Sequence, residues 1–146
     1  MPIEPGVLDA NVLVYSIDAD SSQHAAARAL VDSARDASVT LYVTSQILCE
    51  FFSIITNPRR VAAPLRSVDA WNVLSALLAH PGLYILPLPA NAVAGWMALL
   101  QRRPVTGANI YDLQIIAAMQ VNGVRRVYTF NAVDFAAFPE LVVVTP

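Results

Sequence analysis

Three acidic side chains, Asp9, Glu50 and Asp112, lie inside apolar stretches of this sequence. Burying a carboxylate is costly unless a partner compensates its charge. No lysine or arginine precedes Arg28, so Asp9 has no basic neighbour in its own segment. Three carboxylates without local cations predict that a divalent metal ion binds between them. Oxygen ligands select hard cations, so we expect Mg²⁺, with Mn²⁺ as the other candidate.

Such a site is suited to the hydrolysis of phosphodiester bonds. A bound metal ion lowers the pKa of a water molecule and offsets the negative charge that develops on the phosphate in the transition state. Mg²⁺ is usually held by a few carboxylates together with substrate phosphates. We therefore expect Asp9, Glu50 and Asp112 to be both metal ligands and catalytic residues.

Asp9 also has a purely structural interpretation, as a residue that caps a turn or a helix. The apolar run continues after it through residues 12–14, which favours a buried strand over residues 7–14 instead. In an extended chain Asn11 points to the same side as Asp9. We therefore expect Asn11 to support a ligand or a water molecule beside Asp9.

The other two carboxylates have structural interpretations as well. Glu50 belongs to a polar stripe on a predicted helix, and this stripe faces either solvent or a polar cleft; the sequence leaves both open. Asp112 follows Asn109 at the spacing of a capping box, and acidic residues are favoured near a helix N-terminus. A carboxylate in a first helical turn can also bind a metal, so the two roles of Asp112 are compatible.

Strands alternate with helices along the chain, which predicts an α/β fold, a single-domain α/β/α sandwich with a central parallel sheet. The expected strands cover residues 7–14, 40–44, 85–88, 126–130 and 141–144. The expected helices cover residues 23–37, 45–56, 67–79, 90–101 and 109–121, with Ser45 as a helix cap and Asn122-Gly123 as a helix end. Ligands bind beyond the carboxyl ends of the strands in such sheets. Four side chains should meet there: Asp9, Glu50, Asp112 and Asn131.

The composition narrows the class of protein. A length of 146 residues predicts one domain, and 56% hydrophobic with 14% charged residues fits a buried parallel sheet. The net charge of −2 excludes general electrostatic attraction to nucleic acid, so any such contact must be local. The single cysteine, Cys49, excludes an intramolecular disulfide, and we expect a buried thiol.

No targeting or membrane-spanning segment is predicted. The N-terminus lacks the basic and apolar regions of a signal peptide, which favours a cytoplasmic location. Residues 70–101 contain no aspartate, glutamate, lysine or arginine. However, Pro81, Gly82, Pro87 and Pro89 divide this stretch into pieces shorter than the about 20 residues that a spanning helix needs.

Four short motifs, taken in order, resemble those of the PIN (PilT N-terminus) domain, and specifically those of VapC-type toxin ribonucleases of type II toxin–antitoxin pairs. The motifs lie at residues 8–15, 45–51, 112–118 and 129–135. The resemblance runs from about residue 7 to residue 144 and implies a single PIN domain over residues 1–146. It also implies a metal-dependent endoribonuclease leaving 5′-phosphate ends, a homodimer, and a small VapB-type antitoxin whose tail occludes the acidic site.

The resemblance assigns roles to individual residues. Asp9, Glu50 and Asp112 match the core acids that bind the metal. Asn131 falls where many relatives have aspartate, and Asp134 is the other candidate for this fourth acidic position. Supporting polar positions are matched by Asn11, Thr129 and Asn131.

An acidic site needs cations to attract RNA, and the bound metal is one of them. The pairs Arg59-Arg60 and Arg102-Arg103 are the candidate RNA contacts, although either pair could equally be ordinary surface charge. The departure at Asn131 motivates an alternative function, a PIN-like module that binds RNA or protein without cleaving it. This alternative predicts weak or absent metal binding and no cleavage.

Overall fold

A sheet of five short parallel strands lies at the centre of the computed structural model, which describes residues 2–146. The strands are β1 (Gly6–Leu8), β2 (Leu41–Val43), β3 (Leu83–Ile85), β4 (Arg126–Tyr128) and β5 (Val142–Val144). Their order across the sheet is β3-β2-β1-β4-β5, and every neighbouring pair is parallel. The carboxyl end of β1 is therefore flanked by the ends of β2 and β4.

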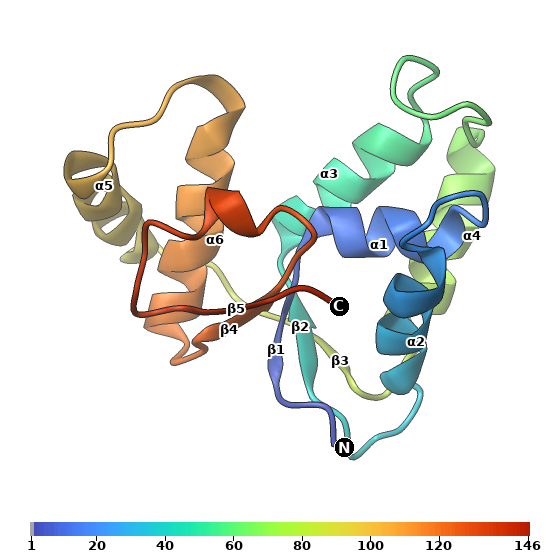
Figure 1. Cartoon of the computed structure of the whole chain (residues 1–146), viewed down its shortest axis with the longest axis horizontal. Coiled ribbons are helices and arrows are strands. Elements are labelled where there is room, and N and C mark those ends of the chain that lie inside the picture. Colours follow the sequence, from blue (N-terminus) through green and yellow to red (C-terminus); the bar gives the residue numbers. More distant parts are fainter. Residues whose placement is uncertain (1) are drawn as a thin grey trace.

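Helices cover the sheet on both sides. They are α1 (Ala10–Ile17), α2 (His24–Ser33), α3 (Ser45–Ile55), α4 (Ser67–Leu78), α5 (Ala92–Arg102) and α6 (Ile110–Val121), with short 3₁₀ turns η1 (Gly107–Asn109) and η2 (Ala132–Asp134). Helices α5 and α6 lie to one side of the strands and α1 to α4 to the other (Figure 1). The predicted α/β/α sandwich with a parallel sheet is confirmed. None of the helices within residues 2–146 has the length and apolar character needed to cross a membrane.

The first apolar run divides at Asp9, so the predicted strand over residues 7–14 is wrong beyond Leu8. Asp9 has an extended backbone and is the N-cap of α1, its carboxylate accepting a hydrogen bond from the Ala10 N–H at 2.8 Å. Helix α1 packs against both α2 and α3, and residues 12–14 are buried within it. A short apolar run can form either a buried strand or a buried helix, because its periodicity does not distinguish the two.

The other predicted elements are present with shifted ends. The strand expected over residues 85–88 is β3, which ends at Ile85, and the helix expected over residues 23–37 is the shorter α2. Thr44, rather than Ser45, caps α3 by accepting a hydrogen bond from a backbone N–H of the first turn at 3.1 Å. Helix α6 ends as predicted, because Gly123 takes a φ of +69°, which glycine adopts without steric cost.

Helix α3 presents different residues to the core and to solvent. Ile47 and Phe51 are fully or almost fully buried. Cys49 is exposed, so the prediction of a buried thiol is wrong. Its position between two core-facing residues on a helix turns it away from them, which its apolar character alone does not indicate.

Candidate active site

Four acidic side chains come to the carboxyl edge of the sheet from four different elements. Asp9 directly follows β1, and Glu50 lies on α3, which follows β2. Asp112 lies in the first turn of α6, and Asp134 ends η2 shortly after β4. Burial, followed by the charges of Asp9, Asp134 and Glu50, raises the pKa of Asp112 to about 7. The three acids singled out in the sequence thus share one electrostatic environment, with Asp134 as a fourth.

Asp9 is the most buried of these acids, with 7% of its surface exposed. Its Oδ1 accepts the bond from Ala10, and its Oδ2 accepts bonds from Thr129 Oγ1 at 2.8 Å and from Asn11 Nδ2 at 3.1 Å. Burial raises the pKa of Asp9; hydrogen bonding lowers it, and the charge of Asp134 raises it further. The capping role that the sequence argued against is therefore real, and it fixes the orientation of the carboxylate.

Asn11 and Thr129 join α1 to the end of β4. Asn11 Nδ2 also donates to Thr129 Oγ1 at 3.1 Å, and its Oδ1 accepts from the Phe130 N–H at 3.0 Å. Thr129 is fully buried, and its Oγ1 accepts a bond from the Asn131 N–H at 3.0 Å. Asn11 does lie beside Asp9, although it does so from the first turn of a helix and not from an extended strand.

Replacing Thr129 by valine tests this network, because valine keeps the shape and removes the hydroxyl. The Asp9 carboxylate and the Asn131 N–H would each lose a buried partner, so we expect a loss of about 1–3 kcal/mol in the free energy of unfolding. Groups that orient a metal ligand typically affect metal affinity or activity by about 10–100-fold. Urea unfolding and cleavage rates would measure both effects, with Thr129→Ser as the matched control. Equal cleavage by the valine and serine variants would contradict the prediction.

Glu50 lies at the rim of the acidic site. Its side chain is exposed, yet partial burial and then the charge of Asp9 raise its pKa, while Arg60 lowers it. The polar stripe of α3 therefore meets solvent and the acidic site at once, so the two alternatives left by the sequence are both partly correct.

Asp112 is half-buried at the start of α6. The predicted capping box with Asn109 is wrong. Asn109 belongs to η1 and has helical backbone angles (φ −64°, ψ −16°), and its side chain makes no capping hydrogen bond. An N-cap residue needs an extended backbone to direct its side chain at the helix. The Asp112 carboxylate is therefore free of a capping role.

This donor set fits a hydrated divalent cation. The chain has no lysine, and the salt bridges found within residues 2–146 involve none of the four acids. Over the same part of the chain, no three acidic, histidine or cysteine side chains are grouped closely enough to hold an ion between them, so the predicted binding of one ion between three carboxylates is not found in this structure. Mg²⁺ commonly takes one or two carboxylates and keeps several waters, so it does not require such a group.

A groove of about 770 Å³ adjoins the acidic site. Asn11 and Asn131, both part of the network around Thr129, are among its lining residues. Arg60 also lines it, whereas Arg59 does not. Both arginines are exposed, and neither forms a salt bridge with the described residues. Of the two predicted arginine pairs, only Arg60 lines the groove, and Arg102 forms a salt bridge with Glu140 instead.

Most of the groove was missed by sequence reasoning. Its walls come from the connection after α1, residues 18–23, and from the connection after α3, residues 60–65. Neither segment contains a recognisable motif, and they lie far apart in the sequence. Both segments line the groove together with Val14, Tyr15 and Ile17 of α1, so only the tertiary structure reveals it.

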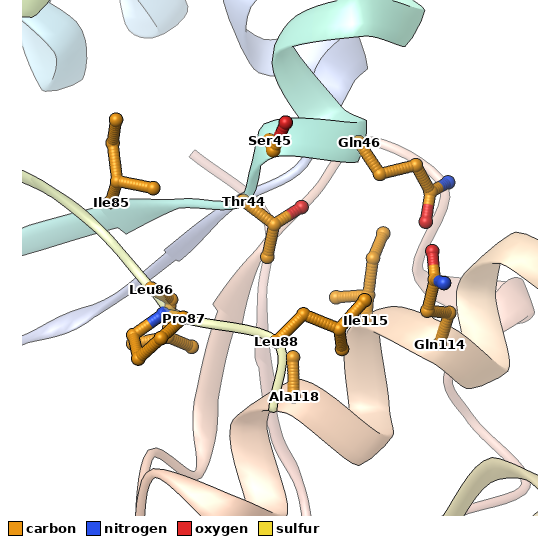
Figure 2. A pocket seen from close by; sticks show the side chains of 10 residues that line it. All are labelled: Thr44, Ser45, Gln46, Ile85, Leu86, Pro87, Leu88, Gln114, Ile115 and Ala118. Carbon is orange, nitrogen blue, oxygen red and sulfur yellow. The ribbon is translucent and has the colours of Figure 1, made fainter. Parts of the chain in front are cut away.

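A smaller hollow of about 140 Å³ lies between the end of β3, the start of α3 and α6 (Figure 2). Figure 2 shows the amide ends of Gln46 and Gln114 directed toward one another at its side. Gln46 Oε1 is buried there without a hydrogen-bond partner. None of the lining residues is acidic or basic. This hollow therefore offers no acidic or basic group for chemistry, in contrast to the acidic site and its groove.

Residues 6–141 match the family model of the PIN domain, so the chain belongs to the PIN domain family. Among curated proteins it is similar to VapC ribonuclease Mb2897 of Mycobacterium bovis and to ribonuclease VapC43 of Mycobacterium tuberculosis. Each is 33% identical over 106 residues, which are 73% of this chain and 70% of the relative. The family predicted from the four motifs is thereby confirmed.

Solved structures share the fold at lower sequence identity. VapC20 of Mycobacterium tuberculosis, a sarcin–ricin loop cleaving toxin, superposes with a TM-score of 0.71 at 17% identity and covers 98% of this chain and 100% of that one. VapBC2 of Rickettsia felis, solved bound to a DNA fragment from its promoter, gives a TM-score of 0.67 at 18% identity, with 98% and 99% covered. These likenesses establish the common architecture over almost the whole length of each chain.

Proposed function

We propose that this protein is a metal-dependent endoribonuclease and the toxin of a VapBC toxin–antitoxin pair. The observation that carries the proposal is the group of four carboxylates, from Asp9, Glu50, Asp112 and Asp134, at the carboxyl edge of the sheet. None of them forms a salt bridge within the described residues, and the charges of the other three help to raise the pKa of Asp112. The named ribonucleases among its relatives support the reaction class. The site chemistry supports phosphodiester hydrolysis, because uncompensated carboxylates attract the cation that this reaction uses.

Asp9 and Asp112 would hold the metal most directly, with Glu50 and Asp134 completing the acidic site. A bound Mg²⁺ or Mn²⁺ supplies a water of lowered pKa and offsets charge on the phosphate. The protein's part is to orient the carboxylates: Ala10, Asn11 and Thr129 fix that of Asp9. Asp134 fills the fourth acidic position in this proposal, because its charge reaches Asp9 and Asp112.

Cleavage of pooled, end-labelled cellular RNA by the purified protein, freed of any bound partner, tests the proposal. We expect discrete fragments with 5′-phosphate ends in Mg²⁺ or Mn²⁺, and none in EDTA. Cleavage that is unaffected by EDTA would contradict the metal-dependent mechanism. Folded protein that binds RNA and never cuts it would support the non-cleaving binding module instead.

The same proposal includes a VapB-type antitoxin, a homodimer and a cytoplasmic location. The antitoxin partner is supported by the similarity of the fold to a solved VapBC complex and a toxin–antitoxin complex from Klebsiella pneumoniae, the latter with a TM-score of 0.61. Exposed apolar side chains provide surface for such contacts, including Val68 and Trp71 on α4 and Val93 and Met97 on α5. Light scattering of the purified protein would measure its mass, and a monomer at all concentrations would contradict the dimer.

A further inference from the structure

The groove beside the acidic site has a built connection to Asp9. Asn11 lines the groove and donates to the Asp9 carboxylate at 3.1 Å. Asn131 also lines it, and its backbone N–H binds the threonine hydroxyl that donates to Asp9. The Tyr15 ring, another lining residue, packs edge-on against Phe130 with ring centres 5.3 Å apart. A ligand in this groove therefore lies against the same network that orients the catalytic carboxylate.

We propose that the groove binds a short single-stranded RNA segment continuous with the scissile phosphate, with Arg60 contacting the phosphates of that segment. This inference rests on the proposed nuclease function and adds the path of the substrate. It separates two neighbouring arginines that the sequence treats alike, since Arg60 lines the groove and Arg59 does not.

Charge distinguishes the walls of the groove. Arg60 comes from the connection after α3, and it is close enough to the acidic site to lower the pKa of Glu50. The connection after α1 contributes Asp18 and Asp20, which repel phosphate. The sugar–phosphate backbone would therefore follow the Arg60 wall. Bases would face the other wall, where carboxylate, hydroxyl and amide groups can bind base edges.

The volume and lining favour unstacked nucleotides over a double helix. About 770 Å³ falls within the range of pockets that enclose small ligands. Proteins recognise RNA sequence mainly in single-stranded loops and ends, whose bases can enter such pockets. A basic protein tail attracted by the acids would be repelled by Arg60, whereas an RNA phosphate is attracted by it. With its phosphates along the Arg60 wall and its bases along the wall of Asp18 and Asp20, an RNA strand can be accommodated even though acids outnumber the one arginine in the lining.

Binding of fluorescein-labelled random RNA decamers, followed by anisotropy at several salt concentrations, tests this assignment. The full-length Asp9→Asn protein serves as the background, so that cleavage does not consume the probe. We expect Arg60→Ala to weaken binding about tenfold and to make the salt dependence less steep by about 0.7 in log K against log[salt]. Ala63→Trp, which fills the groove from an exposed lining position, should weaken binding to a similar extent without removing charge.

Matched controls come from the opposite edge of the sheet, where α2 leads into the amino end of β2. Arg35→Ala removes the same charge, and Ala37→Trp adds the same bulk at an exposed position. Both should bind RNA within about twofold of the background, because neither residue lines the groove. Loss of the exposed Arg35–Asp32 ion pair should also cost little stability. Thermal unfolding of every variant would establish that all are folded.

If Arg60→Ala and Ala63→Trp bind RNA as the controls do, the proposal is overturned and the groove serves another ligand, such as a protein segment. Cleavage by the wild-type chain is measured in parallel to separate the two hypotheses. Groove-dependent RNA binding without cleavage would support the groove and reject the nuclease. If the wild-type chain cleaves RNA while the groove variants bind RNA as the controls do, the nuclease is supported and the groove is rejected as its RNA site.

Discussion

Asp9→Asn is expected to lower RNA cleavage by at least about 100-fold while leaving the stability of the protein nearly unchanged. Asparagine lacks the charge that would bind the metal. It is as good an N-cap as aspartate, so α1 keeps its first hydrogen bond. The bonds that Asp9 Oδ2 accepts from Thr129 and Asn11 would be lost to the new amide, and removal of a buried charge and of its repulsion with Asp134 offsets this loss.

Single-turnover cleavage and thermal unfolding would separate these two effects, with induced expression in cells as a third measurement. The wild-type chain expressed without a partner should arrest growth, and Asp9→Asn should not. Asp9→Ala is the informative comparison, because it removes the cap as well and should lose about 1 kcal/mol of stability. Cleavage by Asp9→Asn at the wild-type rate would rule out Asp9 as a metal ligand.

Metal-free protein is expected to become less stable as the pH rises from about 4 to above 7. The pKa of Asp112 is about 7 in the folded protein and near 3.8 in an ordinary environment, so the folded state binds more protons than the unfolded chain between these values. The free energy of unfolding therefore falls with rising pH in this window. Burial is the main cause that raises the pKa values of Asp9 and Glu50 as well. These two groups therefore also lower the free energy of unfolding as the pH rises.

Asp112→Asn should remove most of this dependence. It should be more stable than the wild type at pH 8, by the order of 2 kcal/mol, because solvent screens part of the repulsion around a half-buried group. At pH 4 the two proteins should be nearly equal. Urea unfolding in EDTA across this pH range would measure the difference. A wild-type protein whose stability rises with pH over the same window would contradict the assignment.

Mg²⁺ should reverse the trend, since the ion binds deprotonated carboxylates and releases their protons. The increase in melting temperature on adding Mg²⁺ should therefore be larger at pH 8 than at pH 6. Asp112→Asn should show little increase at either pH. An equal effect of Mg²⁺ on the wild type at both pH values would indicate that the ion does not bind at these carboxylates.

Several features of this protein were determined by its sequence alone. Alternating apolar strands and helices predicted the parallel sheet, because residues buried on both faces of a sheet leave a continuous apolar signal. Asp9, Glu50 and Asp112 could be singled out because a carboxylate in an apolar segment without a basic neighbour has few structural explanations. The order of the four motifs predicted the family.

Other features depended on the fold. Asp9 directly follows β1 and caps α1. The apolar residues around it could not reveal this boundary, because the strand and the helix are both buried and both read as apolar. The pairing of Thr129 with Asp9 depends on β4 lying beside β1, which links residues 120 positions apart. Such a contact depends on the order of strands, and local propensity carries no information about that order.

Tertiary packing also decided between pairs of candidate residues that the sequence could not rank. Asp134 joined the acidic site through the turn of η2, while Asn131 contributed its backbone N–H. Arg60 entered the groove and Arg59 remained outside it. The sequence by itself supplied the residue types that can do the chemistry. Tertiary packing decided which of them share one space, because adjacent residues in a connection diverge according to what the chain packs against.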